Sequence, residues 1–427
     1  MLIALYQILS ILLLPLLLLW HLYRSLSRGR SPAFAQRLGF LPQNVKKQLA
    51  GRPVIWLHAV SVGEVMAARP LLKALKEQYP NHALLLSVTT ETGRTVAAKL
   101  PEPDCCIYFP FDLLPAVKML LGKIRPSLII IMETEIWPTF CTEAARRKIP
   151  QMLVNGRISD RSIGRYQKMV WFFRHPLALF NHLCMQSELD KQRIISIGAP
   201  AERTTISGNL KYDIPWQQVP TELRNQLRQH YGIATDKLVV VAASTHPGEE
   251  ELWLQAWQKV TDEQNRLQLV LVPRHPERAA ELAVLLEKQG IDHKLRTSLA
   301  EDDVLMPGQV LLVDTVGELM KMYSLSDLTF VGGSLVPTGG HNLLEPASLG
   351  IPFIFGPYMQ NFREISELSL QAGAGVQVAD VAELEQALQD FLHSPELRQV
   401  IGANGLKMLR DNGGATKRIM ELVTQYL

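Results

Sequence analysis

Short apolar runs, each followed by a loop and an amphipathic helical pattern, recur in two series along the chain. The first series comprises Val54–Val60, Ala83–Thr89, Leu128–Met132, Met152–Asn155 and His182–Gln186. The second comprises Leu238–Ala243, Leu267–Val272, Val310–Asp314, Leu328–Val331 and Pro352–Phe355. Apolar runs of about four to eight residues that alternate with helices are typical of parallel strands buried on both faces. The pattern therefore predicts two α/β domains in tandem.

A Pro-containing polar stretch, residues 212–221, separates the two series and is interpreted as a linker. We assign residues 53–211 to an N-terminal Rossmann-like domain and residues 222–427 to a C-terminal one. The helical pattern near Pro395–Leu427 predicts a last helix that packs back on the first domain. Ligands of parallel sheets bind at the carboxyl ends of the strands. We therefore expect the two domains to face a cleft and to close over a ligand there.

The N-terminal apolar run is longer than the others. Leu2–Tyr23 carries no charged side chain, and an apolar stretch of about 20 residues matches the ~30 Å hydrocarbon core of a bilayer. Residues 1–24 are interpreted as a membrane-anchor helix, and spanning is favoured because the run is apolar all round rather than two-faced. A cleaved signal peptide is disfavoured because Ala33-Phe34-Ala35 lies well beyond the run and no basic segment precedes it.

The following segment, residues 25–52, is basic. Its cations are Arg28, Arg30, Arg37, Lys46, Lys47 and Arg52. Lys and Arg beside an anchor stay on the cytoplasmic side and are attracted to an anionic phospholipid surface. The net charge of the whole chain is only +3, so no nucleic-acid partner is implied.

Several common sites are absent from the sequence. It contains no G-x-G-x-x-G, no P-loop and no H-E-x-x-H motif, and no two aspartates stand at i and i+2. The four cysteines have no zinc-site spacing. Glu301-Asp302-Asp303 is interpreted as a solvated loop. We therefore expect chemistry without a metal and without a cofactor.

Glu64 follows the first apolar run and precedes a helical pattern. Ser61-x-x-Glu64 fits a capping box, in which the two side chains bind free amides of the helix. The position on the first strand-to-helix loop, beside Gly63, instead favours a general base that takes a proton from an acceptor hydroxyl. Both interpretations stay open at this point.

Further candidates lie at later strand ends of the first half. Glu133 and Glu135 follow an all-apolar run, where carboxylates are costly unless paired or functional, and the pattern does not choose between them. Lys211 could stabilise negative charge or be an ordinary linker lysine. The basic stretch after the fifth run could hold acceptor phosphates or form a solvated helix face; it contains Arg157, Arg161, Arg165 and Lys168.

The second half carries a more specific pattern. Gly332-Gly333-Ser334 and Gly339-Gly340 precede a helix start, which favours backbone amides that converge on a phosphate. Glu345, one turn on, could accept hydrogen bonds from ribose hydroxyls. Other strand-end candidates are Ser244-Thr245-His246, which precedes the acidic helix start Glu249–Glu251, as well as Arg274, Asp314, Gly317 and Glu318.

These residues resemble the 3-deoxy-D-manno-oct-2-ulosonic acid (Kdo) transferases of Gram-negative bacteria over nearly the whole chain. The resemblance rests on His-x-Val-Ser-Val-Gly-Glu at 58–64, Met-Glu-Thr-Glu-x-Trp-Pro at 132–138, Gly-x-Leu-Lys-x-Asp at 208–213, Val-Pro-Arg-His-Pro-Glu-Arg at 272–278 and Phe-Val-Gly-Gly-Ser with Gly-Gly-His-Asn at 330–342. One difference is Leu343, where some relatives have proline; the loop amide is retained, so we expect no loss of function.

The resemblance implies a metal-independent, two-domain (GT-B) glycosyltransferase. It implies transfer of Kdo from CMP-Kdo to the lipid A precursor, at the cytoplasmic face of the inner membrane. It further implies Glu64 as catalytic base and Glu133 and Lys211 as transition-state stabilisers. The expected CMP-binding residues are Pro273, Arg274, Val316, Gly317, Glu318, Asn342, Leu343, Leu344 and Glu345.

Three alternatives remain at this point. One is a transferase that uses another nucleotide sugar with a membrane lipid, and another is an epimerase of the same fold. The third is a membrane-bound nucleotide sensor, which would not explain carboxylates at strand ends. No local motif reports how many Kdo units are added.

Overall fold

The computed structural model describes residues 2–27, 29, 31–261, 267–300 and 302–427. The chain forms two compact units, Met1–Ile214 with Asn412–Leu427, and Pro215–Asp411. Arg28, Arg30 and Glu301, named above, lie outside the described residues.

The first unit contains a parallel sheet of seven strands in the order β3-β2-β1-β4-β5-β6-β7. Its strands are β1 Val54–His58, β2 Ala83–Val88, β3 Cys105–Tyr108, β4 Leu128–Met132, β5 Gln151–Gly156, β6 His182–Met185 and β7 Thr204–Ile206. Its helices are α1 Leu2–Leu12, α2 Leu14–Leu26, α3 Phe34–Arg37, α4 Gln43–Leu49, α5 Val62–Gln78, α6 Glu91–Ala97, α7 Leu114–Ile124, α8 Pro138–Arg146, α9 Asp160–Lys168, α10 Val170–Ala178, α11 Glu188–Ser196 and α20 Ala415–Val423, with short 3-10 turns η1 Ala201–Arg203 and η2 Leu210–Tyr212.

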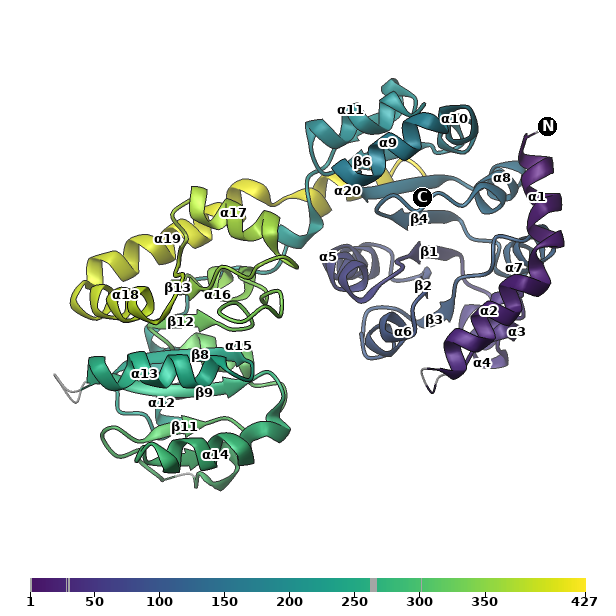
Figure 1. The fold of residues 1–427 in the computed structure, drawn as a ribbon. Coiled ribbons are helices and arrows are strands. Elements are labelled where there is room, and N and C mark those ends of the chain that lie inside the picture. The colour runs from purple at the N-terminus through teal and green to yellow at the C-terminus, as the bar shows by residue number, and fades with distance from the viewer. Residues whose placement is uncertain (1, 28, 30, 262–266, 301) are drawn as a thin grey trace. The chain divides into compact units, whose positions relative to one another are not determined.

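Helices cover both faces of this sheet (Figure 1). Along β1 the side chains alternate between two cores: Val54 and Trp56 pack with α4, α7 and α8, whereas Ile55 and Leu57 pack with α5, α6 and α20. Successive strand residues point to opposite faces of a sheet. A run that is apolar at every position is therefore required, because both faces are buried.

The second unit repeats this arrangement with a parallel sheet in the order β10-β11-β9-β8-β12-β13-β14. Its strands are β8 Leu238–Thr245, β9 Leu267–Pro273, β10 His293–Leu295, β11 Val310–Leu312, β12 Leu328–Val331, β13 Phe353–Phe355 and β14 Gly375–Gln377. Its helices are α12 Thr221–His230, α13 Glu249–Thr261, α14 Ala279–Lys288, α15 Leu319–Leu325, α16 Leu344–Ser348, α17 Arg363–Gln371, α18 Val381–His393 and α19 Pro395–Asn412, with short turns η3 Pro276–Arg278 and η4 Arg296–Ser298.

The predicted fold class is confirmed: each unit is a parallel sheet between helices. Of the fourteen strands in the two sheets, ten correspond to the predicted runs. The sequence pattern missed four strands, β3, β7, β10 and β14, which lie at the edges of the two sheets. These strands have only three or four residues. An edge strand pairs on one side only, so it does not require a long apolar run.

The expectation of one continuous anchor helix is wrong. The apolar run forms α1 and α2, which are bent by 56° at Leu13. No single helix in the described part of the chain is long and apolar enough to cross a membrane, whereas this bent pair has the length and composition to do so. The cause is Pro15 in the first turn of α2, because proline lacks an amide hydrogen and clashes with the carbonyl four residues earlier.

The helix pair is also two-faced, which the sequence did not indicate. On one side the Tyr6 hydroxyl donates to the Asp112 carboxylate at 3.0 Å, and its ring lies 5.7 Å from that of Phe172. On the other side Leu12, Leu16 and similar side chains are more than half exposed. The pair therefore packs on the first unit and leaves an apolar outer face.

The last helix, α20, belongs to the first unit. Asp213 accepts hydrogen bonds from the amides of Gly414, Ala415 and Thr416 at the start of this helix. Arg418 donates from Nε to the Ser207 carbonyl at 2.7 Å. A carboxylate at a helix N-terminus satisfies free amides and complements the helix dipole, so Asp213 fixes the end of the chain to the unit in which the chain begins.

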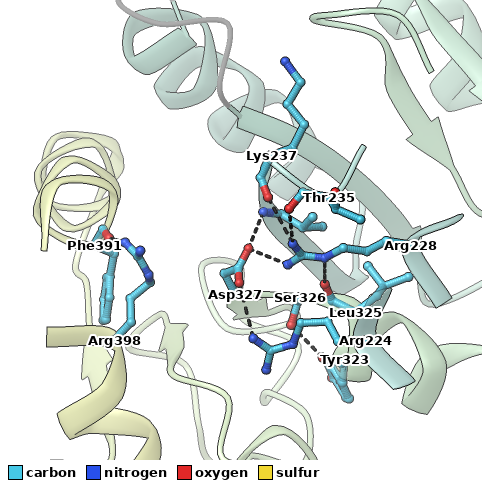
Figure 2. Close-up of polar contacts among 11 residues, drawn as sticks. Arg224, Arg228, Thr235, Lys237, Tyr323, Leu325, Ser326, Asp327, Phe391 and Arg398 are labelled. Carbon is cyan, nitrogen blue, oxygen red and sulfur yellow. Dashed lines mark hydrogen bonds and ion pairs between the residues drawn. The ribbon is translucent and has the colours of Figure 1, made fainter. Parts of the chain in front are cut away.

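The second unit is held together at the amino ends of its central strands by a buried ion pair. Figure 2 shows Asp327 facing Arg224 and Arg228 of α12. Arg228 donates from Nη2 to Asp327 at 2.6 Å and from Nε to the Leu325 carbonyl at 3.0 Å, and it is only 4% exposed. Asp327 also accepts from the Val239 amide at 2.8 Å. This network joins α12 to β8 and β12.

Replacing Asp327 by Ala should therefore destabilise the second unit. Loss of the carboxylate leaves the Arg228 cation buried without a counter-charge, which costs about 3–5 kcal/mol. Urea unfolding followed by the fluorescence of Trp253 and Trp257, both buried in this unit, measures the change. Asp236→Ala, which removes an exposed carboxylate of the same unit, is the control; equal unfolding free energies for the two variants would contradict this account.

Candidate active site

Glu64 lies at the carboxyl edge of the first sheet, in the first turn of the helix that follows β1. Its Oε2 accepts from the Val60 amide at 2.8 Å, its Oε1 accepts from the Ser61 hydroxyl at 3.0 Å, and its own amide donates to the Ser61 hydroxyl at 3.4 Å. The helix-capping interpretation is thus confirmed. It does not exclude a catalytic role, because each carboxylate oxygen has a second acceptor position.

Burial raises the pKa of Glu64 above that of an ordinary glutamate; its hydrogen bonds to Val60 and Ser61 oppose the change, and the charge of Glu135 adds to it. The side chain is only 7% exposed. A carboxylate with a raised pKa is a stronger base in its ionised form. The environment of Glu64 therefore suits proton abstraction.

Glu133 and Glu135 follow β4, the strand that pairs with β1. Glu133 has a positive φ of 54°, and its amide donates to the Val154 carbonyl at 2.8 Å. Non-glycine residues in this region cost about 1–3 kcal/mol and cluster at functional sites. Burial, followed by the charge of Glu133, raises the pKa of Glu135. The three carboxylates therefore lie at one edge of the sheet, and strain marks Glu133 among them.

Lys211 lies in η2, which packs against the helix α5 that carries Glu64. The segment is held by two asparagines: Asn155 accepts from the Leu210 amide at 2.9 Å, and Asn209 accepts from the Lys211 amide at 3.0 Å. Asn155 itself has a φ of 56° at the end of β5. Among the residues that the structure describes, the Lys211 ammonium forms no salt bridge. The structure thus places Lys211 at the carboxyl edge of the first sheet, where Glu64 also lies.

The basic stretch after β5 lies on the surface. Helix α9 has no buried residue, and Arg161, Arg165 and Lys168 are exposed along it. Arg157 precedes the helix and is exposed as well. This arrangement agrees with a solvated helix face and equally with a phosphate-binding surface, so the two interpretations remain open.

The predicted donor-binding residues of the second unit follow β9, β11 and β12, which lie with β8 side by side in the sheet. Arg274 is exposed after β9, and its amide donates to the Thr245 carbonyl at 3.0 Å. Burial raises the pKa of Glu345, and the charge of Arg274 opposes this change. The charges of Arg274 and Glu345 therefore act on each other at the same edge of the sheet.

The segment Asn342–Glu345 is ordered by its own side chains. The side-chain oxygen of Asn342 accepts from the Leu344 backbone amide at 3.2 Å, and its side-chain nitrogen donates to the Glu345 carboxylate at 3.3 Å. Leu343 and Leu344 are buried in the unit, as is Pro273. These three residues therefore offer a ligand their backbone rather than their side chains.

The loop after β11 offers backbone to a ligand. Val316 is 87% exposed, and Gly317 has a φ of 89°. The carboxylate of Glu318 is engaged within the unit: Tyr231 donates to it at 2.8 Å, and Arg296 lies 3.5 Å away. Glu318 is therefore held in place by the unit, while the main chain of the preceding Val316 and Gly317 lies in an exposed loop.

The first glycine pair does not leave its amides free for a phosphate, which corrects the sequence interpretation. The amides of Gly333, Ser334 and Leu335 donate to the carboxylate of Glu249 at 2.7, 2.8 and 2.8 Å. Glu249 is fully buried and also accepts from the His246 amide at 3.1 Å. A carboxylate of the chain itself thus accepts the hydrogen bonds of these three convergent amides. The sequence shows an acidic helix start here, but nothing in it connects Glu249 with a loop more than 80 residues away.

A histidine pair adjoins this loop and was also missed. His246 and His341 place their Nε2 atoms 2.9 Å apart with nearly parallel rings. Burial, followed by the positive charge of His246, Arg274 and His275, lowers the pKa of His341 to about 4. Burial also lowers the pKa of His246, and the short Nε2–Nε2 contact links the two rings by a hydrogen bond.

Within the residues that the structure describes, no three His, Cys, Asp or Glu side chains gather as ligands of a metal ion. The four cysteines are buried thiols, and burial raises their pKa. They are therefore structural residues rather than reactive ones.

Comparison with known proteins identifies both units. Residues 32–214 match the family of 3-deoxy-D-manno-octulosonic-acid transferases (kdotransferases), and residues 225–408 match glycosyl transferases group 1. The 3-deoxy-D-manno-octulosonic acid transferase of Haemophilus influenzae is 35% identical over 406 residues, which cover 93% of each chain.

Solved structures share the fold at low identity. A glycosyltransferase from Rickettsia africae has a TM-score of 0.55 at 12% identity, over 88% of this chain and 99% of that chain. A UDP-GlcNAc 2-epimerase from Neisseria meningitidis also has a TM-score of 0.55, at 15% identity, over 87% of this chain and all of the other. Together with the sequence relatives, these findings lead to one conclusion. The chain belongs to the 3-deoxy-D-manno-octulosonic acid (Kdo) transferase family and is a glycosyltransferase with two GT-B-type α/β domains.

Proposed function

We propose that the protein transfers Kdo from CMP-Kdo to the lipid A precursor lipid IVA, without a metal ion, in the synthesis of the lipopolysaccharide inner core. The observation that carries this proposal is the environment of Glu64. In a chain of the Kdo transferase family, a buried carboxylate with a raised pKa lies at the edge of a parallel sheet, and the segment of Lys211 packs against its helix.

The proposed reaction is a single displacement that inverts the anomeric carbon. The acceptor hydroxyl forms the new bond to that carbon while the bond to the phosphate oxygen of CMP breaks. The Glu64 carboxylate receives the hydroxyl proton, and the departing electron pair leaves with CMP. Lys211 and Glu133 stabilise the charges that develop at the sugar. Preorganised charges of this kind act strongly in sites from which water is excluded.

In the second unit we assign donor binding to the exposed Arg274, to the segment Asn342–Glu345 and to the main chain of Val316–Glu318. Arg274 supplies the cation for the phosphate, and Glu345 supplies an acceptor for ribose hydroxyls. The amides of 333–335 have no part in phosphate binding, because Glu249 occupies them. Their role is to hold the loop that precedes His341 and Asn342.

The apolar outer face of α1 and α2 supports a membrane site for this reaction. We propose that this face enters the cytoplasmic leaflet of the inner membrane, where the acyl chains of the acceptor also lie. Basic side chains of residues 25–52 would add attraction to anionic phospholipids, an effect that salt weakens.

Another nucleotide-sugar donor is the main alternative, and an epimerase is the second. The likeness to the UDP-GlcNAc 2-epimerase shows the fold alone, and an epimerase does not account for an apolar face next to the site. A nucleotide sensor would not need the cluster of like-charged carboxylates in the first unit or the backbone strain at Glu133. Titration of the purified chain with CMP and with UDP separates the donor classes: tighter binding of UDP would contradict the proposal.

Glu64→Gln should abolish transfer while leaving CMP binding unchanged. Loss of a general base costs about 10²- to 10⁴-fold in rate, and the CMP-binding residues lie in the other unit. Glu77→Gln, an exposed change on the same helix, is the matched control. Transfer by Glu64→Gln at the rate of this control would remove Glu64 from the proposed role.

The pH dependence of transfer should report the same group. The base acts in its ionised form, and its pKa is raised by burial. The rate should therefore fall as the pH drops through a value above the ordinary glutamate pKa of 4.5. A profile of kcat from pH 4 to 8 measures this limb; an acid limb centred at or below 4.5 would contradict the assignment.

Glu249→Gln should weaken CMP binding. An amide group cannot accept four backbone hydrogen bonds as a carboxylate does, so one or more buried amides lose their partner at about 1–3 kcal/mol each. The loop before Asn342 then loosens. Calorimetric titration with CMP measures the effect, with the exposed Glu251→Gln on the same helix as control. Equal CMP affinities for the two variants would show that the buried carboxylate does not support the donor site.

A further inference from the structure

A cavity of about 730 Å³ lies within the first unit, between the N-terminal helix pair and the loops that follow β2 and β3. Leu13, Leu17 and Trp20 line it from the helix pair, and Thr89–Thr92 and Phe109–Leu113 line it from the sheet edge. Pockets for small molecules measure about 300–1,000 Å³ and are mostly apolar with a few polar groups. The cavity is therefore large enough for an organic ligand.

Arg37 lines this cavity and is a buried cation that lacks a full set of partners. It is 5% exposed; Nη2 donates to the Thr89 carbonyl at 2.7 Å, and the guanidinium lies 4.6 Å from the centre of the Tyr108 ring. Its Nε is buried and has no hydrogen-bond partner. Among the described residues Arg37 forms no salt bridge. The charge of Glu91 acts on Arg37, but without a direct ion pair. A buried guanidinium that has no carboxylate or anion in contact is costly, which points to an anion that completes the site.

The charged side chains that line the cavity are two arginines and two carboxylates, and the arginine Arg37 is the one with an unpartnered buried nitrogen. Arg24 and His21 also line the cavity, and Glu91 is the acidic group whose charge acts on Arg37. The other acidic residue of the lining, Asp112, is already engaged: it accepts from the Tyr6 hydroxyl and from the amides of Thr139 and Phe140. Burial lowers the pKa of Arg37, yet a guanidinium stays charged at neutral pH.

The cavity adjoins the loop that carries the proposed base. The amides of Thr89 and Thr90, and the Thr90 hydroxyl, donate to the Val60 carbonyl at 3.2, 3.0 and 3.1 Å. The Val60 amide in turn donates to Glu64 at 2.8 Å. One residue thus connects the cavity wall with the Glu64 carboxylate.

We propose that this cavity binds a phosphorylated lipid, with the phosphate on Arg37 and an acyl chain against Leu13, Leu17 and Trp20. The helix pair then forms one wall of a lipid site in addition to its outer, membrane-facing side. That the bound lipid is the acceptor of sugar transfer rests on the proposed function; that the cavity takes a phosphorylated amphiphile does not. The lipid in this position would lie one loop away from Glu64.

The test titrates the full chain, in dodecyl maltoside micelles, with dodecyl phosphate and separately with inorganic phosphate, and follows bound phosphate by phosphorus NMR. Dodecyl phosphate should bind the wild type at least tenfold more tightly than inorganic phosphate does. Arg37→Gln should lose about tenfold or more in dodecyl phosphate affinity, the scale of hydrogen bonds to a charged group. Lys99→Gln, an equal loss of charge at an exposed site of the same unit, should leave it unchanged.

A second variant tests the proposal independently, in case Arg37→Gln fails to fold. Leu17→Trp fills the apolar end and leaves Arg37 in place, and it should weaken dodecyl phosphate but not inorganic phosphate. Wild-type affinity for dodecyl phosphate in both Arg37→Gln and Leu17→Trp would overturn the proposal, as would equal binding of the two probes to the wild type.

Kdo transfer, measured in parallel, keeps the two proposals apart. Wild-type binding of dodecyl phosphate without any Kdo transfer would contradict the proposed function and leave the lipid site standing. Kdo transfer with an unchanged acceptor KM in both variants would contradict the lipid site alone.

Discussion

Buried carboxylates that bind backbone amides are the interaction on which the loops of both units depend. A parallel sheet buried on both faces leaves its loop amides at the edges without ladder partners, and unpaired buried amides are costly. Three buried acids of the chain accept hydrogen bonds at such positions: Glu64 from the Val60 amide, Asp112 from the amides of Thr139 and Phe140, and Glu249 from the amides of residues 333–335. The loops at these places are therefore rigid before any ligand arrives.

This constraint also determines which groups remain for chemistry. In the first unit Glu64 is held in this way, Glu133 and Glu135 follow the neighbouring strand, and burial raises the pKa of Glu64 and Glu135. In the second unit it leaves Arg274 and a hydrogen-bonded histidine pair at the carboxyl edge of the sheet. One unit thus presents buried carboxylates at its strand ends, and the other presents an exposed arginine.

Most of the fold could be predicted from the sequence, because strands buried on both faces need an unbroken apolar run. The edge strands β3 and β14 pair on one side only and do not need such a run, so the sequence pattern did not predict them. The break between α1 and α2 follows from Pro15. The prediction of one continuous helix was based on the apolar composition of the run and did not take this proline into account. The pairing of Glu249 with Gly333, and of His246 with His341, could not be predicted, because periodicity and spacing carry no information on contacts between distant segments. The positions of Glu64 and Lys211 at a strand edge were predictable, whereas the strain at Glu133 was not.

The central claim is that this chain moves Kdo from a cytidine nucleotide onto a membrane lipid. The most direct test is the mass of the lipid product after the purified chain is incubated with CMP-Kdo and lipid IVA in the presence of EDTA. The account predicts a lipid heavier by one or more whole Kdo residues, with release of CMP. An unchanged lipid mass, or a product that forms only after a divalent metal is restored, would contradict it.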